Sequence, residues 1–356
     1  MLSDNISERI TIPFNITASE RNIGDCRTKA FKQIFDHYGF DYSIQEIFGV
    51  GRGVAFSTVE CKYGNIPLIS IEGRNFKAES EFCKYAGVEC KEHFFEKNDN
   101  ILNEEIPFNL EILKYIELGN PVLVQCDVFY MDYLNRISKT HNEYHVITII
   151  GFDKVRKTLS VVDSLLNEVK EISMSELYNA MFSKQYSIEK RAVWYSVSRV
   201  DSKKLTLCSD IHKQAINDLG KRFIAENGDL YELKEFVAFT ERILSKAKNN
   251  SSNHIQYLDY LVNGVCYIVR QQDELNGSCF RSLYLRYLND LKENYPDLDL
   301  SDIITFLEGS EEVWRKIAYK LRYSKDDIVV KTQQMIDYLD CIYEYELNAA
   351  NAMAIL

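Results

Sequence analysis

The sequence is poor in proline and carries no excess of positive charge. Five prolines occur in 356 residues, and 42 lysines and arginines stand against 53 aspartates and glutamates, which gives a net charge of −11. A protein that binds nucleic acid has the opposite balance, because phosphate contacts need clustered basic side chains. The composition therefore argues against nucleic acid as a partner.

Long apolar runs are also missing. No run reaches the roughly 18 residues that a membrane helix needs, and the first residues, Met1–Ile6, have neither the basic nor the apolar region of a signal peptide. We therefore expect a cytoplasmic protein that does not bind a membrane. Hydrophobic residues make up 46% of the chain and charged residues 27%, as in an ordinary globular protein. The length suggests about two domains.

The nine cysteines form no framework of disulfide or zinc-site spacing. No Cys-x-x-Cys pair occurs, and Cys83, Cys90 and His93 have no fourth ligand at the spacing of a zinc site. In a cytoplasmic protein the cysteines should be reduced. We expect no metal and no cofactor bound by this chain.

One cysteine stands where a helix is expected to begin. Apolar side chains recur at helical spacing from Ala30 to Phe35, and Gly24–Asp25 supply a turn and a cap before Cys26. A thiol at the N-terminus of a helix lies at the positive end of the helix dipole, which favours the thiolate. Cys26 is therefore either a reactive nucleophile or a buried small hydrophobic residue, since free cysteines are often buried.

Three glycines alternate within residues 49–53. Such spacing indicates tight turning or a close approach of the backbone to another group. It is not a dinucleotide-binding fingerprint, because no strand precedes it and no helix follows. The segment is either a plain loop or one wall of a pocket around Cys26.

The apolar patterns predict an α+β protein. Strands are expected at 9–14, 54–63, 66–71, 89–95, 122–126, 144–152, 158–163 and 192–200, and helices at 26–38, 44–48, 76–86 and 109–118. After residue 201 helical periods dominate, at 211–226, 230–247, 255–272, 280–293, 311–323 and 326–347. We therefore expect a domain with an antiparallel sheet over residues 1–200, followed by an all-helical domain over residues 201–356.

A histidine and an aspartate fall on neighbouring strands of one expected hairpin. If the hairpin turns at residues 153–157, residue 147 pairs with residue 163, and His145 and Asp163 are diagonal neighbours on one face. Asp163 can then fix the tautomer of His145 and leave the other ring nitrogen for a nucleophile. Of the six histidines, only His145 has a carboxylate on a paired strand. The alternative is a histidine satisfied within the core.

The order of a cysteine, a histidine on a strand about 120 residues later and an aspartate on the next strand matches papain-like enzymes. Residues 1–200 resemble the BtrH-like N-terminal family, named for butirosin biosynthesis protein H. The similarity lies in Gly24–Phe31, His37–Gly39, the glycines of 47–53, Asn120–Tyr130, Tyr144–Val146 and Val162–Asp163. In that family a histidine usually precedes the cysteine, and here Asp25 takes its place. The chain is also similar to the papain-fold amide synthases of polythioamide (closthioamide) assembly.

The resemblance implies a papain-like fold and a cysteine-dependent acyltransferase of antibiotic or other natural-product biosynthesis. Such an enzyme moves an acyl group from a carrier-protein thioester to an amine. Carried onto this sequence, the family makes Cys26 the nucleophile, His145 the general base and acid, and Asp163 the orienting group. It also implies two partners: an acyl or peptidyl carrier protein, whose phosphopantetheine arm presents the substrate, and a small amine acceptor.

Three further residues, Asn22, Asp127 and Tyr130, are candidates for contact with the substrate. The backbone N–H of Cys26 is one candidate oxyanion donor, and the side chain of Asn22 is a second. Asp127 stands at a strand end before an aromatic segment that includes Tyr130. It is expected either to contact the amine or to be an ordinary loop carboxylate.

Two other functions stay open from the sequence. A papain-like peptidase or amidase has the same triad and uses water in place of the amine. A papain-like shell with a buried Cys26 would instead be a non-catalytic interaction protein. Alkylation of Cys26 in the native protein tests the last of these, and diversion of the product by an added amine separates transfer from hydrolysis.

Overall fold

The computed structural model describes residues 8–16, 24–63, 66–96, 105–134, 141–142, 144–166, 168–183, 190–199, 207–249, 252–271 and 277–356. The chain divides into two compact units. The first unit consists of Met1–Arg21, Cys26–Ser43 and Ala86–Leu205. The second unit consists of Asn22–Asp25, Ile44–Tyr85 and Thr206–Leu356.

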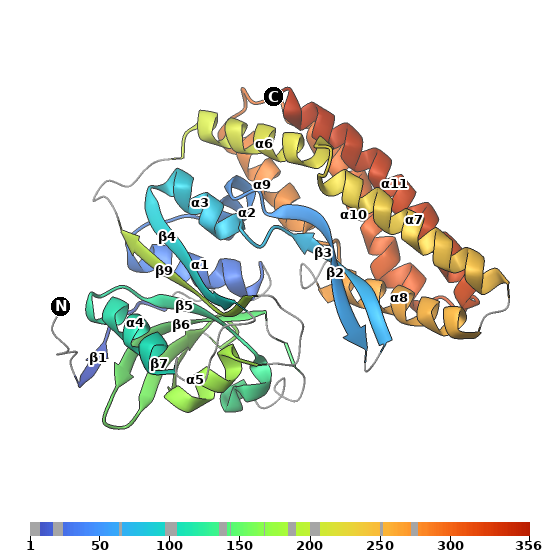
Figure 1. Ribbon diagram of the computed structural model, residues 1–356. Coiled ribbons are helices and arrows are strands. Elements are labelled where there is room, and N and C mark those ends of the chain that lie inside the picture. Colours follow the sequence, from blue (N-terminus) through green and yellow to red (C-terminus); the bar gives the residue numbers. More distant parts are fainter. Residues whose placement is uncertain are drawn as a thin grey trace. The chain divides into compact units, whose positions relative to one another are not determined.

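An antiparallel sheet forms the centre of the first unit (Figure 1). Its strand order is β4 (Val88–Glu96), β9 (Lys190–Arg199), β5 (Val122–Cys126), β6 (His145–Asp153), β7 (Thr158–Asp163) and β8 (Glu168–Ser173), and β1 (Arg9–Thr11) pairs with β6. Every described pairing in it is antiparallel. The expected α+β class and the antiparallel sheet are thus confirmed.

Helices cover both faces of this sheet. Side chains of α4 (Glu105–Glu117) and α5 (Met174–Met181) share a core cluster with Val122 and Val124 of β5. On α1 (Cys26–His37), Arg27 donates a hydrogen bond to Gln125 of the same strand at 2.6 Å. Since neighbouring residues of a strand point to opposite faces, α1 lies on the face opposite to α4 and α5.

A bulge sets the register between β6 and β7. At the turn Asp153 pairs with Thr158, whereas the predicted pairing of residues 147 and 163, continued to the turn, would pair residue 152 with residue 158. The extra residue Ile150 then shifts the ladder back by one. Continuing the ladder places residue 147 opposite residue 163, as predicted from the sequence. The bulge thus brings the site end of the hairpin into the expected register.

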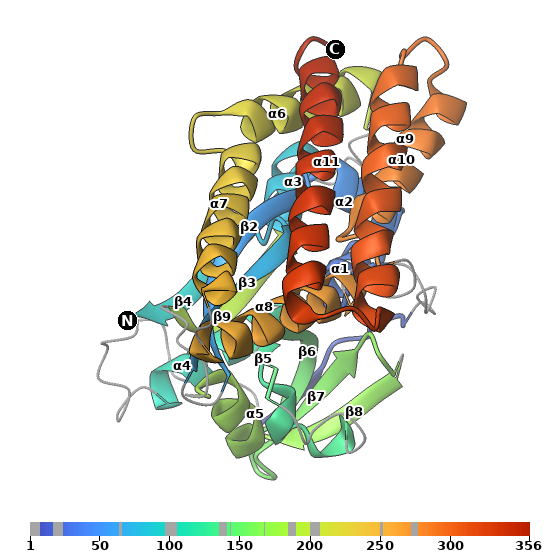
Figure 2. The same cartoon turned by 90° about the vertical axis from the view of Figure 1, so that its right-hand side faces the viewer.

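Helices form most of the second unit. They are α6 (Ser209–Ile224), α7 (Asp229–Lys248), α8 (Ser252–Gln271), α9 (Arg281–Asn294), α10 (Ser301–Arg315), a π-helical turn (Lys316–Leu321) and α11 (Ile328–Ala354). The long helix α11 runs beside α6, α7 and α10 (Figure 2). The unit also holds α2 (Ile44–Val50), most of α3 (Ala78–Ala86) and the hairpin of β2 (Val54–Tyr63) and β3 (Ile66–Arg74).

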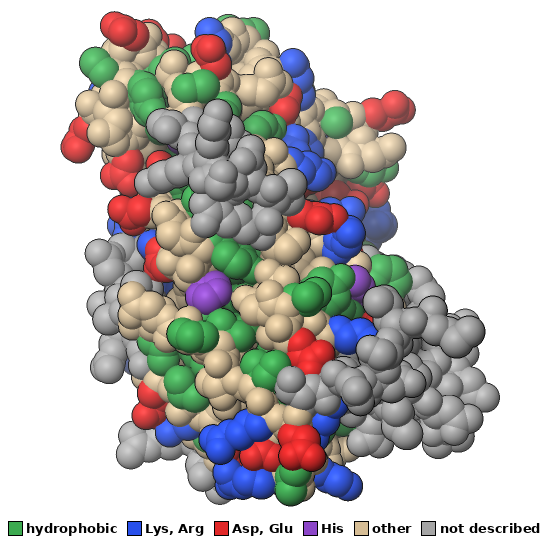
Figure 3. Space-filling model, turned by 90° about the vertical axis from the view of Figure 1, so that its left-hand side faces the viewer, with side chains coloured by type: hydrophobic (Ala, Val, Ile, Leu, Met, Phe, Trp, Pro, Cys, Tyr) green, Lys and Arg blue, Asp and Glu red, His purple; other side chains and the backbone are tan. Residues whose placement is uncertain are grey.

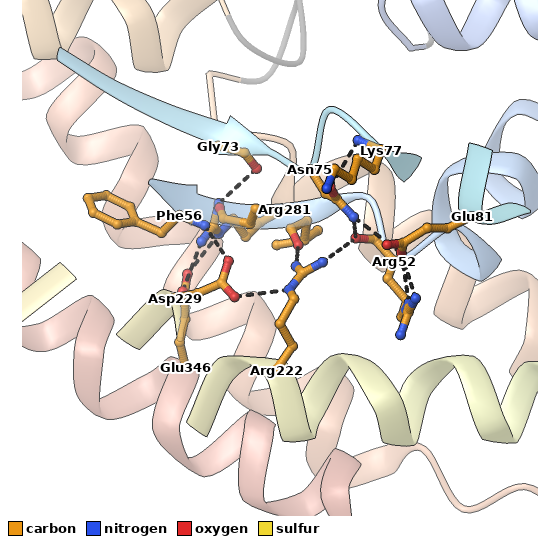
Figure 4. Close-up of polar contacts among 12 residues, drawn as sticks. Arg52, Phe56, Gly73, Asn75, Lys77, Glu81, Arg222, Asp229, Arg281 and Glu346 are labelled. Carbon is orange, nitrogen blue, oxygen red and sulfur yellow. Dashed lines mark hydrogen bonds and ion pairs between the residues drawn. The ribbon is translucent and has the colours of Figure 1, made fainter. Parts of the chain in front are cut away.

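Buried charged side chains join this hairpin to the helices (Figure 4). Arg281 of α9 donates hydrogen bonds to the carbonyl oxygens of Ala55 and Gly73 at 2.9 and 3.4 Å. Asp229 of α7 accepts the backbone N–H of Phe56 at 2.7 Å. These bonds explain why residues 44–85 group with the C-terminal helices. The sequence had assigned that segment to the domain of residues 1–200, and the unit expected to be all-helical contains a β-hairpin.

The alternating glycines pack within the second unit. A Cβ atom on Gly49 would clash with the ring of Tyr287, and one on Gly51 would clash with the carbonyl oxygen of Ala78. Glycine is needed at both positions because another segment approaches the backbone closely. Packing within the second unit therefore accounts for Gly49, which lies inside α2, and for Gly51.

Charges of both signs are mixed on the surface. On the face shown in Figure 3, acidic and basic side chains of the described residues lie among one another. The edge strand β8 follows the same pattern, with Glu168 bound to Lys170 at 2.7 Å and Glu171 bound to Arg156 at 2.8 Å. Charged side chains on an edge strand oppose pairing with other chains. Within the described ranges, no helix is both long and apolar enough to cross a membrane.

Candidate active site

Cys26 begins α1, as the sequence predicted. The turn before the helix contains Gly24, whose φ of +75° lies in the region that favours glycine. The side chain of Cys26 is partly exposed, and its Sγ lies 3.9 Å from the carbonyl oxygen of Tyr144. Tyr144 directly precedes β6, so the thiol lies at the end of the strand that begins with His145.

His145 and Asp163 form a buried pair. The Nε2 atom of His145 lies 2.9 Å from Oδ2 of Asp163, and the two side chains are 4% and 0% exposed. The carboxylate also accepts the backbone N–H of Leu165 and the hydroxyl of Tyr133, each at 2.9 Å. With Nε2 held by Asp163, the Nδ1 atom of His145 is the ring nitrogen left for the hydrogen bond with Cys26.

The electrostatics of this pair favour its charged form. Burial by itself would lower the pKa of His145, but the charge and hydrogen bond of Asp163, together with the hydrogen bond of Cys26, raise it to about 10. Burial would raise the pKa of Asp163, but His145, the N–H of Leu165 and the hydroxyl of Tyr133 hold it below its usual range. An imidazolium next to a thiol favours the thiolate. The arrangement can therefore supply a nucleophile and a proton donor together.

The pair should make the free energy of unfolding depend on pH. The contribution of His145 is complete below its usual pKa of 6.5 and is lost as pH rises toward 10. The contribution of Asp163 is present above pH 3.8 and is lost as pH falls below it. The stability difference between the wild type and His145→Gln should shrink above pH 6.5, by up to about 1.4 kcal/mol per pH unit. Urea unfolding at about pH 5.5 and pH 9 measures it, and equal differences at the two pH values would contradict the charged pair.

Two residues of this site were not predicted from the sequence. Tyr133 lies in a short 3-10 turn, Asp132–Leu134, and no sequence spacing links it to Asp163. Cys126 pairs directly with His145 across β5 and β6, a register that the long connection between the strands hides. Burial and nearby negative charges, chiefly that of Asp163, raise the pKa of the Cys126 thiol well above its usual value. Cys126 is therefore a neutral packing residue beside the histidine.

Asp25, the residue before Cys26, takes part in a partly buried ion pair. Its Oδ2 atom accepts a hydrogen bond from Arg74, which also donates to Glu79 at 2.6 Å. The Arg74 side chain is buried and lies over the ring of Phe48. All four residues belong to the second unit. Asp25 thus has a structural contact at the residue before the nucleophile.

Asp127 lies at the end of β5 and is fully buried. Its Oδ2 atom lies 2.7 Å from Nδ1 of His141 and accepts the hydroxyl of Ser183 at 2.7 Å. Its Oδ1 atom accepts the backbone N–H groups of Phe129 and Asn142 at 3.1 and 2.9 Å. Burial would raise the pKa of Asp127, but these hydrogen bonds lower it overall. Asp127 is an ionised anchor for the segments around it, and its own oxygens already have partners.

The other groups predicted to contact the substrate are Tyr130, Asn22 and the backbone N–H of Cys26. Tyr130 is half-buried and packs against the core, with its ring centroid 5.2 Å from that of Phe129. Asn22 lies outside the described residues. The backbone N–H of Cys26 is at the first position of α1, where a helix leaves its N–H groups without partners inside the helix.

Two of the residues considered as zinc ligands, His93 and Cys83, have packing or hydrogen-bond contacts in the structure. His93 stacks on Trp194 with ring centroids 3.8 Å apart, and its Nε2 atom lies 3.0 Å from the hydroxyl of Ser196. Cys83 is buried on α3. In the part of the chain that the structure describes, three or more histidine, cysteine, aspartate or glutamate side chains do not come together in a metal-binding arrangement.

A cysteine at the start of a helix, beside a buried histidine–aspartate pair on an antiparallel sheet, is the arrangement of papain-like cysteine enzymes. Residues 25–164 match the family model described as Butirosin biosynthesis protein H, N-terminal. The match contains Cys26, His145 and Asp163 and confirms the resemblance seen in the sequence. It indicates a BtrH-like domain of the biosynthetic acyltransferase type. No curated protein matches the chain.

Proposed function

We propose that this protein is a cysteine-dependent acyltransferase that forms an amide during natural-product biosynthesis. Its acyl donor is a thioester on the phosphopantetheine arm of an acyl or peptidyl carrier protein, and its acceptor is a small amine. One observation carries the proposal: the Cys26 thiol begins a helix beside the buried His145–Asp163 pair, within the segment that matches the BtrH N-terminal family. The proposal assigns no cofactor to this chain, because the pantetheine arm belongs to the carrier.

The first half of the reaction acylates Cys26. The thiolate attacks the thioester carbonyl, a new C–S bond forms to Sγ, and the bond to the pantetheine sulfur breaks. The imidazolium of His145 gives its Nδ1 proton to the departing thiolate. The backbone N–H of Cys26 is the proposed donor to the oxyanion, and Asn22 stays the candidate for a second donor.

The second half transfers the acyl group. A neutral amine attacks the acyl-enzyme, and His145, now uncharged, takes one proton from the attacking nitrogen. The bond to Sγ then breaks, which releases the amide and restores the thiolate–imidazolium pair. Asp163 holds the imidazole in place through both halves and stabilises its positive charge.

A thioester surrogate tests this proposal. The protein is mixed with a butyryl thioester of N-acetylcysteamine, and released thiol, amide and acid are measured with and without butylamine. We expect thiol release together with amide that increases with amine concentration, and neither with Cys26→Ala. Butyric acid as the sole product at every amine concentration would instead show a hydrolase. Absence of thiol release would favour the non-catalytic interaction protein.

A further inference from the structure

Tyr133 reaches the triad from the connection between β5 and β6. Its hydroxyl donates to Oδ2 of Asp163 at 2.9 Å, and the Nε2 atom of His145 lies 2.9 Å from the same oxygen. The other carboxylate oxygen, Oδ1, accepts the backbone N–H of Leu165 at 2.9 Å. The oxygen that holds the catalytic histidine is therefore shared with a second donor.

This second donor stays neutral. The ring of Tyr133 packs against the core cluster of the first unit. Burial, together with the charge and hydrogen bond of Asp163, raises the pKa of Tyr133 above its usual value of 10. The phenol therefore keeps its proton over the pH range in which an enzyme works, and it acts on Asp163 only as a hydrogen-bond donor.

The two halves of the proposed reaction need His145 in different protonation states. Acylation uses the imidazolium, which gives its Nδ1 proton to the departing pantetheine thiolate, whereas transfer needs the neutral imidazole, which takes a proton from the attacking amine. Burial lowers the pKa of His145, but Asp163 and Cys26 raise it to about 10 in the free enzyme. Acylation removes the contribution of the Cys26 thiol and leaves that of Asp163. The charged pair thus suits acylation and opposes transfer.

We infer that Tyr133 is a positioning residue that weakens, through Asp163, the hold of the carboxylate on the proton of His145 and so favours the transfer half. Its hydroxyl competes with the Nε2–H group of His145 for the negative charge of one oxygen. The hydroxyl binds that oxygen more strongly when His145 is neutral, because no imidazolium then balances the carboxylate. The neutral imidazole is favoured by this difference. The inference rests on the proposed function and extends it to the control of one half-reaction.

Titratable groups on the neighbouring elements also act on this network. Cys26 of α1 acts on His145. Cys126 of β5 and Glu176 of α5 act on Tyr133. Cys26 carries the acyl group during transfer and does not titrate, and the other two are the same in all the proteins compared below. A difference between those proteins therefore reports the hydroxyl of Tyr133.

The test follows the transfer half by itself. Cys26 is acylated with the butyryl thioester of N-acetylcysteamine and freed of excess thioester by rapid desalting. Hydroxylamine is then added at several values from about pH 7 to pH 10, and loss of the butyryl group is followed by intact mass. Hydroxylamine is uncharged over this range, so its own protonation does not contribute. Its nitrogen bonds to the acyl carbon, the bond to Sγ breaks, and His145 takes the proton. Its direct reaction with the free thioester is subtracted.

Two substitutions are compared with the wild type. Tyr133→Phe keeps the ring and removes the donor. Tyr38→Phe is the matched control, because it removes a hydroxyl of the same unit that donates to the carbonyl oxygen of Val197 at 2.6 Å and to Asn120 at 3.1 Å. Acylation of Cys26 is measured for each protein near neutral pH.

Transfer by the wild type should rise with pH as His145 loses its proton. In Tyr133→Phe the midpoint of this rise should move up by about one pH unit, since a hydrogen bond to a charged group is lost. Transfer below the midpoint should then fall about tenfold, while acylation should change less than about twofold. Tyr38→Phe should keep the wild-type midpoint.

A stronger donor should have the opposite effect. With 3-fluorotyrosine in place of Tyr133, fluorine makes the hydroxyl more acidic, so the midpoint should move down. This protein keeps the hydroxyl and decides the question if Tyr133→Phe does not fold. A lower midpoint in Tyr133→Phe would show that the hydroxyl only holds Asp163 in place. That result, an unmoved midpoint in either protein, a shift in Tyr38→Phe, or equal losses in acylation and transfer would overturn the inference and leave the acyltransferase intact. Failure of the wild type to acylate Cys26 would overturn the proposed function, and this inference with it.

Discussion

Limiting iodoacetamide near pH 6.5 is expected to label Cys26 faster than the other cysteines of the native protein. Exposure alone predicts another order, because Cys208 and Cys341 are exposed whereas Cys26 is only partly so. An ordinary thiol is almost wholly protonated at that pH, and the thiolate is the reactive form. The imidazolium of His145 beside Cys26 should reverse the order, so that Cys26 reacts at least about tenfold faster than Cys208 and Cys341. Peptide mass spectrometry measures all of them in one sample.

The variant His145→Ala supplies the control for this experiment. Labelling of Cys26 should fall to the level of Cys208 and Cys341, whose own labelling should not change. Acyl transfer in the same variant should fall by about 10²- to 10⁴-fold, the range for loss of a general acid–base group. Cys26 labelling that is slower than that of the two exposed cysteines in the wild type would contradict a histidine-activated thiolate.

Replacement of Glu346 by alanine is expected to cost about 3–5 kcal/mol of unfolding free energy, because it leaves a buried guanidinium without its carboxylate. Glu346 and Arg281 are 1% and 0% exposed, and they are joined by two hydrogen bonds of 2.8 and 2.9 Å. The same carboxylate accepts the hydroxyl of Ser310 and the indole N–H of Trp314. The guanidinium also donates to the β2–β3 hairpin (Figure 4). The substitution should therefore destabilise the hairpin as well as the helices.

Urea unfolding of Glu346→Ala measures this cost. Glu312→Gln, which breaks an exposed ion pair with Lys316 in the same unit, is the control and should leave the transition where it is. The paired change Arg281→Met with Glu346→Leu should recover part of the lost stability, since it removes the unpaired charge. If Glu346→Ala is as stable as Glu312→Gln, the buried pair of Arg281 and Glu346 contributes little to the free energy of unfolding.

Local periodicity in the sequence predicted most helices and strands. For each element that it missed, the structure shows why. Strand β8 is an edge strand with charged, exposed side chains, so it lacks the apolar alternation of a half-buried strand. Helix α5, which follows it, has a readable signal: the hydroxyl of Ser173 accepts the N–H of Glu176, as the spacing of a capping box suggests. Helix α10 begins ten residues before the predicted start at Glu311 and contains Gly309, where a side chain would clash with the ring of Tyr345.

The sequence was sufficient to predict the part of the candidate site that lies within one hairpin. His145 and Asp163 share a hairpin, so counting from its turn was enough to place them on one face, even though the bulge at Ile150 was not foreseen. Cys26 was placed by the start of its helix. The structure adds the hydrogen bonds and burial that only the folded chain can supply.

Residues that approach through longer connections could not be predicted. Asp127 and His141 stand at the beginning and near the end of the connection between β5 and β6, and Tyr133 lies within it. These residues meet only because β5 and β6 are neighbours in the sheet, and no periodicity in the sequence reveals that pairing. The sequence left two interpretations for Asp127, and the structure gives it four hydrogen bonds to other groups of the chain.

The grouping of residues 44–85 with the C-terminal helices has a consequence for synthesis on the ribosome. The hairpin and its apolar side chains, such as Phe56 and Ile71, emerge long before helices α7 and α8, with which they share a core. At about 5–20 residues per second, the intervening chain takes roughly ten seconds or more to appear. During that time the helices α7 and α8 that share the core with Phe56 and Ile71 have not yet been made. Apolar side chains of the hairpin therefore stay uncovered by these helices during synthesis, and slowing translation before α7 should increase aggregation.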